Sequence, residues 1–219
     1  VYFSRKNSSI LRLRKTEVDG RAIRKACTNG SSEFMSNVSM SLVGMLYNIQ
    51  LLKFAGENGV AAYGVMMYVS MIFSGAFIGY SIGTAPVTGY HYGAGNHPEL
   101  KSLLRKSLTL IGIFGVGMVI AAEVLALPLV QLFVGYDGEL MALTLSGFRI
   151  FSLAFFFMGF AIFGSGFFTA LNDGLTSALI SFLRTLVFQI SAVLILPIFW
   201  KITGVWVSIV VAEMMAVLL

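Results

Sequence analysis

Long apolar stretches alternate with short polar ones along this chain, and the alternation predicts its elements. Lipid offers the backbone no hydrogen-bond partners, so an apolar stretch of about 20 residues that spans a bilayer must be helical. Glycine-rich polar clusters such as 56–59 and 135–138 mark the turns between the stretches. The pattern predicts an all-α polytopic membrane protein, a bundle of six transmembrane helices at 30–53, 59–90, 106–134, 140–170, 175–199 and 203–219.

Composition points to the same environment. Hydrophobic residues make up 57% of the chain and charged residues 11%, and the mean hydropathy is +0.85. A soluble domain of 219 residues could not bury so much apolar surface. The single cysteine, Cys27, excludes an internal disulfide framework. The chain has no initiator Met and its last helix lacks a cap, so we expect a fragment of a longer protein.

Positive charge is concentrated at the start of the chain. Residues 1–25 carry eight basic and two acidic side chains, a net charge of +6, whereas the remainder has a net charge of −1. Lys101, Arg105 and Lys106 are expected on the same side of the membrane as this leader, and that side is predicted to be cytoplasmic. Basic and aromatic residues do not interleave as they do on nucleic-acid-binding surfaces, so no nucleic-acid partner is expected.

A motif at the end of the second predicted helix carries a family resemblance. Residues 86–94 read Pro-Val-Thr-Gly-Tyr-His-Tyr-Gly-Ala, and a basic amphipathic stretch, 100–106, follows. This order resembles the multidrug and toxic compound extrusion (MATE) family of cation-coupled efflux pumps, in which a Pro-x-x-Gly-Tyr-x-Tyr-Gly-Ala stretch ends the second helix of each six-helix lobe. Residues 56–64, and residues 167–172 followed by Arg184, are similar to the carboxy-terminal lobe.

The resemblance implies an architecture and a set of partners. Residues 26–219 would form the carboxy-terminal six-helix lobe, its last helix truncated, of a twelve-helix, two-lobe transporter, and residues 1–25 the cytoplasmic linker between lobes. The amino-terminal lobe of the same chain would be missing. The other expected partners are a drug-like small molecule and membrane lipid. No cofactor is implied beyond a coupling ion, H⁺ or Na⁺, and the location implied is a bacterial plasma membrane, where the protein is multi-pass.

The same motif predicts a hinge on physical grounds. Pro86 lacks an amide proton for the helix ladder, and Gly89 and Gly93 permit bending and close packing. The alternative is a static helix end in which the small residues only serve packing.

Ionisable residues inside predicted spans are the main candidates for a cation or substrate site, because charge at membrane depth is costly. Arg184 and Glu213 each lie roughly 15 Å from the end of their predicted helix, and these two helices are consecutive. Glu123 and Arg149 lie at about the same depth on another pair of consecutive helices. We predict an ion pair between Arg184 and Glu213, and the positions of Glu123 and Arg149 allow a second. Each pair either fixes helix packing or exchanges its partner for a proton, Na⁺ or a cationic substrate.

Two residues of the first helix are further candidates. Some MATE members use a glutamate of the first helix of this lobe for cation coupling, which draws attention to Glu33. Glu33 nevertheless lies in the first turn of the predicted helix, where the helix dipole alone favours a carboxylate. Asn37 belongs to a polar stripe that either lines a cavity or bonds between helices. The stripe also contains Ser36, Ser39, Ser41, Tyr47 and Asn48.

The favoured function is a secondary active multidrug antiporter lobe that works by alternating access. A lipid or lipid-linked saccharide flippase of the same superfamily, and a non-transporting membrane scaffold, are the alternatives. The sequence contains no phosphate-binding loop, no His-Glu-x-x-His pair and no Gly-x-Ser-x-Gly elbow, so an enzyme is not expected. No catalytic or metal-binding residues are predicted.

Overall fold

The computed structural model describes residues 19–219, except the side chains of Asn29, Ser32, Glu33, Met35 and Ser36. Within these residues the chain is helical between short turns and contains no strand. The elements are α1 (Gly20–Gly93), α2 (His97–Val134), α3 (Gly138–Ser152), α4 (Ala154–Ala170), α5 (Gly174–Phe182), the π-helical segment η1 (Leu183–Gln189) and α6 (Ile190–Val217).

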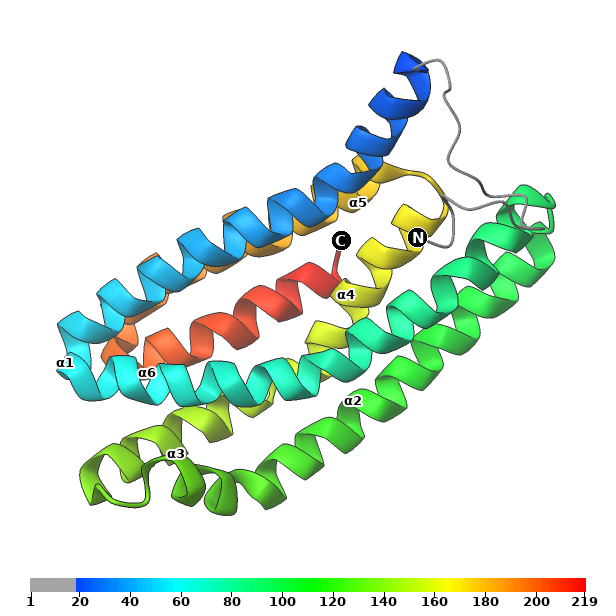
Figure 1. Ribbon diagram of the computed structural model, residues 1–219. Helices are drawn as coiled ribbons and strands as arrows, with labels where there is room; N and C mark the ends of the chain where they lie inside the picture. The colour runs from blue at the N-terminus through cyan, green and yellow to red at the C-terminus, as the bar shows by residue number, and fades with distance from the viewer. Residues whose placement is uncertain (1–18) are drawn as a thin grey trace, which may run out of the picture.

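Two of these helices turn back on themselves. Helix α1 leaves helical geometry at Gly56, where φ is 60° and ψ is −150°, and Figure 1 shows the chain reversing there. Only glycine adopts this backbone conformation at low cost. Helix α6 reverses at Lys201, with φ 48° and ψ −128°. We call residues 20–55 and 57–93 the first and second arms of α1, and residues 190–200 and 202–217 the first and second arms of α6.

The predicted six spans are present. Within residues 19–219, three continuous helical stretches are long and apolar enough to cross a membrane, and α3 with α4 forms a fourth span bent by 49°. The reversals at Gly56 and Lys201 divide two of the three stretches, which yields six apolar arms.

Several predicted boundaries were wrong. The expected turn at 56–59 and the expected gap between the spans 175–199 and 203–219 shrink to one non-helical residue each, Gly56 and Lys201. The third span was predicted to begin at 106, but α2 begins at His97 and includes the basic stretch 100–106. The Asn96 side chain caps this helix by accepting a hydrogen bond from the Glu99 amide. The predicted helix 140–170 is broken at Leu153.

The break between α3 and α4 falls at Leu153. The hydroxyl of Ser152, the last residue of α3, lies 2.7 Å from the carbonyl oxygen of Arg149. The amide of Leu153 then bonds three residues back, to Ile150, at 3.3 Å. The chain resumes a regular helix at Ala154.

The arms run back and forth between two ends of an elongated bundle. Figure 1 shows that the start of α1, the turn from α1 to α2 and the turn from α4 to α5 lie at one end. The reversals of α1 and α6 and the turn from α2 to α3 lie at the opposite end. The second arm of α6 runs between the other arms in Figure 1, and several of its side chains are buried, including Trp206, Ser208 and Glu213.

The centre of the bundle is tightly packed. Tyr47 of α1 stacks on Tyr63 with ring centroids 5.3 Å apart, and its hydroxyl lies 2.7 Å from the hydroxyl of Ser208 on α6. A Cβ added at Gly147 would lie 2.8 Å from Trp206 Cε2. The glycine therefore lets α3 approach α6 closely, as small residues do between membrane helices.

Candidate functional site

Arg184 and Glu213 form a buried, bidentate ion pair. The Arg184 Nε donates to Glu213 Oε1 at 3.1 Å and Oε2 at 2.9 Å, and its Nη2 donates to Oε1 at 2.8 Å. The Glu213 side chain is 1% exposed and the Arg184 side chain 19%. The predicted ion pair is confirmed. Each charge compensates the other inside the bundle, so removing one partner alone would leave a buried charge without a counter-ion.

The π-helical segment η1 brings a third residue to this pair. Gln189 follows Arg184 by five positions, and its Nε2 donates to Glu213 Oε1 at 3.2 Å. Residues five apart in an α-helix point about 140° away from one another, whereas a π-helix bonds five residues apart and brings them to nearly the same face. The π register therefore directs Arg184 and Gln189 to one carboxylate. Gln189 was not predicted; its signal was a lone amide in an apolar stretch.

Glu123 and Arg149 approach each other only loosely. The Arg149 Nε lies 4.0 Å from Glu123 Oε2, and the side chains are 61% and 40% exposed, respectively. The second pair is therefore present, but it is longer than the first and lies on the surface of the bundle. Glu123 faces outward on α2, and Arg149, at the end of α3, reaches toward it across the surface of the bundle.

The hydroxyl of Ser152, which the sequence did not predict as a site residue, also contacts Glu123. Ser152 Oγ lies 2.5 Å from Glu123 Oε1 and 2.7 Å from the Arg149 carbonyl oxygen. A hydroxyl carries one proton, so Ser152 donates to only one of these oxygens at a time. If Glu123 is protonated, its carboxyl can donate to Ser152 while Ser152 donates to the carbonyl. Both protonation states of Glu123 thus find hydrogen-bond partners.

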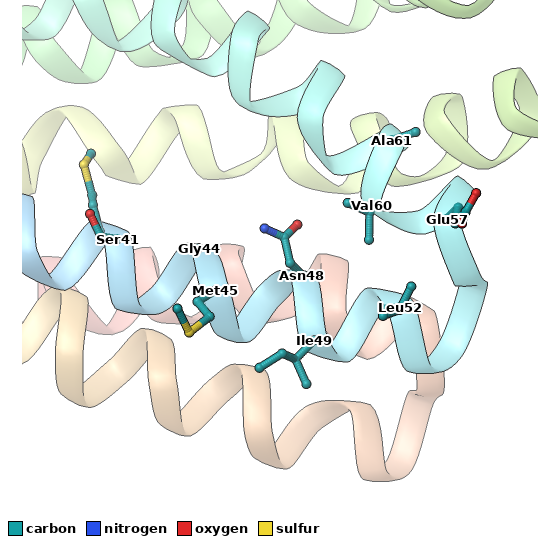
Figure 2. A pocket seen from close by; sticks show the side chains of 10 residues that line it. Ser41, Gly44, Met45, Asn48, Ile49, Leu52, Glu57, Val60 and Ala61 are labelled. Atoms are coloured by element: carbon teal, nitrogen blue, oxygen red, sulfur yellow. The ribbon is translucent and has the colours of Figure 1, made fainter.

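A groove of about 920 Å³ lies between the two arms of α1. Figure 2 shows the Asn48 side chain pointing from the first arm into the space in front of the second arm. The lining is mostly methionine, aliphatic and small, with one carboxylate and no lysine or arginine. It consists of Met40, Ser41, Gly44, Met45, Asn48, Ile49, Leu52, Glu57, Val60 and Ala61.

The family model named MatE matches residues 34–195, most of the chain. The chain belongs to the MatE family. This family is one of transporters rather than enzymes. No curated protein matches the chain.

Solved structures of MATE transporters share the fold. A MATE protein in complex with MaL6 superposes with a TM-score of 0.87 at 22% identity, and an outward-facing multidrug resistance MATE transporter of the MOP superfamily with 0.86 at 23%. Each comparison covers 96% of this chain and 48% of the other. A MOP superfamily transporter from Pyrococcus furiosus, described as having a binding pocket of reversed polarity, matches with 0.84 at 24%, covering 92% of this chain and 46% of that one. The chain spans about half the length of these relatives.

The polar residues on the first arm of α1 in this MatE chain divide between the buried core and the groove. Ser39 and Tyr47 are buried in the core at 0% and 1% exposure. Ser41 and Asn48 line the groove. The stripe was predicted to line a cavity or to bond between helices, and different members do each.

The two other candidates, Asn37 and Glu33, belong to the first arm of α1. Asn37 is an exposed residue of the first arm of α1. The side chain of Glu33 lies outside the described residues, so its role stays a prediction.

The predicted hinge residues lie on an unbroken stretch of helix. Within the described part of α1 only Gly56 departs from helical dihedral angles, so the helix continues through Pro86 and Gly89 and ends at Gly93. A Cβ at Gly89 would lie 3.8 Å from the carbonyl oxygen of Ala170, which places α1 beside the end of α4. Bending at Pro86 stays a prediction.

Proposed function

We propose that this chain is the carboxy-terminal half of a secondary active exporter that moves amphipathic, often cationic small molecules out of the cell in exchange for H⁺ or Na⁺. Membership of the MatE family supports the transporter class. The remaining half of the transporter would be a second six-helix lobe, because the chain spans about half the length of the MATE structures it matches. Substrate would bind between the lobes and reach either side of the membrane in turn.

The chemistry of the α1 groove is the observation that carries the substrate class. Met40 and Met45 are 65% and 62% exposed, and flexible thioether side chains adapt to ligands of different shape. Glu57 supplies negative charge at one end, and Asn48 supplies both hydrogen-bond donors and an acceptor. An apolar groove with one carboxylate suits a hydrophobic cation.

The lining also argues against the flippase alternative. A lipid-linked saccharide carries phosphate, which proteins bind with arginine, lysine or helix amino-termini. The described lining of the groove has no cation, and the charge of the embedded Arg184 is already compensated by Glu213. A phosphate group would find no counter-charge there.

Glu123 is the carboxylate we assign to ion exchange in this half. Glu213 is nearly fully buried and holds hydrogen bonds from Arg184 and Gln189, so exchange would break several charge-assisted bonds at once. Glu123 is 40% exposed, its cation lies 4.0 Å away, and Ser152 can serve its charged and neutral forms. A proton or Na⁺ can therefore reach Glu123 at lower cost.

Dye export by the complete transporter tests the proposal. We expect cells that express it to accumulate less ethidium, and Glu57→Gln and Asn48→Leu to raise accumulation several-fold. Glu123→Gln should make export insensitive to the imposed H⁺ or Na⁺ gradient. Glu99→Gln is the matched control, because this exposed carboxylate in the first turn of α2 lies outside the groove.

Three outcomes would overturn parts of this proposal. Movement of fluorescent phospholipid in reconstituted vesicles without dye export would favour the flippase. The absence of both activities would favour a scaffold. Normal gradient dependence in Glu123→Gln would remove that carboxylate from coupling while leaving the exporter class intact.

A further inference from the structure

A second groove, on the outer face of α2, combines three cations with an apolar continuation. Its volume is about 780 Å³. The lining residues recur at spacings of three and four, so they share one face of the helix. They are Pro98, Lys101, Ser102, Arg105, Lys106, Thr109, Leu110 and Ile113.

Within residues 19–219, the three cations of this groove form no ion pair with a described side chain. Neither of the two ion pairs found among residues 19–219 involves Lys101, Arg105 or Lys106. All three side chains are exposed, and no aspartate or glutamate lines the groove. The groove therefore presents a local excess of positive charge that an anion can neutralise.

The far part of the groove has the opposite character. Leu110 and Ile113 are 49% and 67% exposed, and exposed apolar side chains continue along α2 at Phe114 (45%). From Lys101 to Ile113 the helix rises about 18 Å, enough to pass from the headgroup layer into the hydrocarbon core. A ligand that fits both parts has an anionic head and a hydrocarbon tail.

We propose that this groove is a binding site for an anionic phospholipid. The lipid phosphate lies among Lys101, Arg105 and Lys106, where Ser102 supplies a hydroxyl, and an acyl chain lies along Leu110 and Ile113. The groove is at the end of the bundle where α1 also begins, so the site belongs to the leaflet on that side (Figure 1). Basic clusters next to membrane helices attract anionic lipids in this way.

A matched pair of charge variants separates a site from diffuse attraction. The first replaces Lys101, Arg105 and Lys106 with Gln. The second replaces Arg21, Arg24 and Lys25 with Gln, which removes the same charge from exposed residues at the start of α1. We would titrate each purified full-length protein in detergent with phosphatidylglycerol, with phosphatidylcholine and with inorganic phosphate, and count bound lipid by native mass spectrometry.

We expect phosphatidylglycerol to bind in preference to phosphatidylcholine. Because each cation near the surface contributes about a fivefold gain, the α2 triple variant should bind phosphatidylglycerol at least about tenfold more weakly. The α1 triple variant should change by less than about twofold. If the triple variant does not purify as a single species, Arg105→Gln alone replaces it in the experiment. This single variant should bind phosphatidylglycerol about fivefold more weakly.

Three results would overturn the proposal. Equal losses in both triple variants would mean that total charge, and not this groove, attracts the lipid. Equal binding of the two lipids would mean that the headgroup charge does not matter. Displacement of phosphatidylglycerol by millimolar inorganic phosphate would identify a site for a soluble anion instead.

Discussion

Arg184 and Glu213 lie 29 positions apart in the chain, yet the guanidinium of one contacts both carboxylate oxygens of the other. Their helix segments run side by side after the reversal at Lys201, which brings the two side chains to the same depth. The reversal thus assembles a charge pair that neither helix could hold alone.

Removing one partner should be much worse than removing both. Arg184→Met leaves a 1% exposed carboxylate without its cation, and we expect a loss of about 3–5 kcal/mol in the free energy of unfolding. The double variant Arg184→Met/Glu213→Leu should recover most of this loss. Unfolding in mixed micelles, followed by circular dichroism, measures both.

Arg149→Met is the control for that experiment. Arg149 is 61% exposed and its ion pair is long, so its removal should cost clearly less than the removal of Arg184. Equal losses for Arg149→Met and Arg184→Met would contradict the difference in burial on which the comparison rests.

Gln189→Leu tests the π-helical register. The amide donates to the buried Glu213 carboxylate, and a hydrogen bond to a charged group contributes about 1.5–3 kcal/mol. We expect a loss of stability in this range. Gln131→Leu changes an exposed glutamine on α2 and should have little effect. If both variants unfold alike, the third contact to Glu213 has no energetic role.

Gly147→Ala and Gly117→Ala should change stability in opposite directions. A Cβ at Gly147 would clash with Met66 and Trp206, and overpacking typically costs about 1–3 kcal/mol. A Cβ at Gly117 meets nothing within 4 Å, so the higher helix propensity of alanine should stabilise by about 1 kcal/mol. Melting temperatures in detergent measure both effects, and a neutral Gly147→Ala would show that α3 and α6 can separate freely.

Asp173 should make the start of α5 sensitive to acid. Its carboxylate accepts from the Thr176 hydroxyl at 2.7 Å and the Thr176 amide at 3.1 Å, and these bonds lower its pKa below the ordinary 3.8. The charged form is favoured in the fold. Its stabilisation is therefore complete above pH 3.8 and is lost as the pH falls through the lowered pKa.

Asp173→Asn provides the comparison. Asparagine also caps helices, so the variant should fold at neutral pH but lack this component of acid sensitivity. Hydrogen exchange at the first turn of α5 between pH 5 and pH 2 follows the local effect. A parallel acid response in the two proteins would rule out Asp173 as its source.

The number of spans was predictable, but their ends were not. Stretch length and hydropathy depend only on composition along the chain, which is why six arms were expected and found. At Gly56 and Lys201 the chain reverses at a single residue with non-helical dihedral angles. The polar residues around each reversal do not specify that backbone conformation. The bend at Leu153 likewise falls in an apolar stretch without proline, so the sequence does not mark it.

Charge pairing was half predictable. Counting residues from helix ends placed Arg184 level with Glu213, and Glu123 level with Arg149, because the helical rise is constant. Counting gives depth and not direction. Only the packing of the arms showed that the first pair is enclosed while the second lies on the surface of the bundle.

The amino-acid sequence by itself determined that the chain is an all-α membrane protein of six spans, with basic residues at one end and ionisable groups at depth. These properties follow from local hydrophobicity and residue spacing. Tertiary structure alone decided that Gln189 joins Arg184 on one carboxylate, that Glu123 lies on the surface of the bundle, and that an apolar groove lies between the arms of α1. The reason is physical: burial and hydrogen-bond partners depend on which helix faces meet, and residues distant in the chain supply those faces.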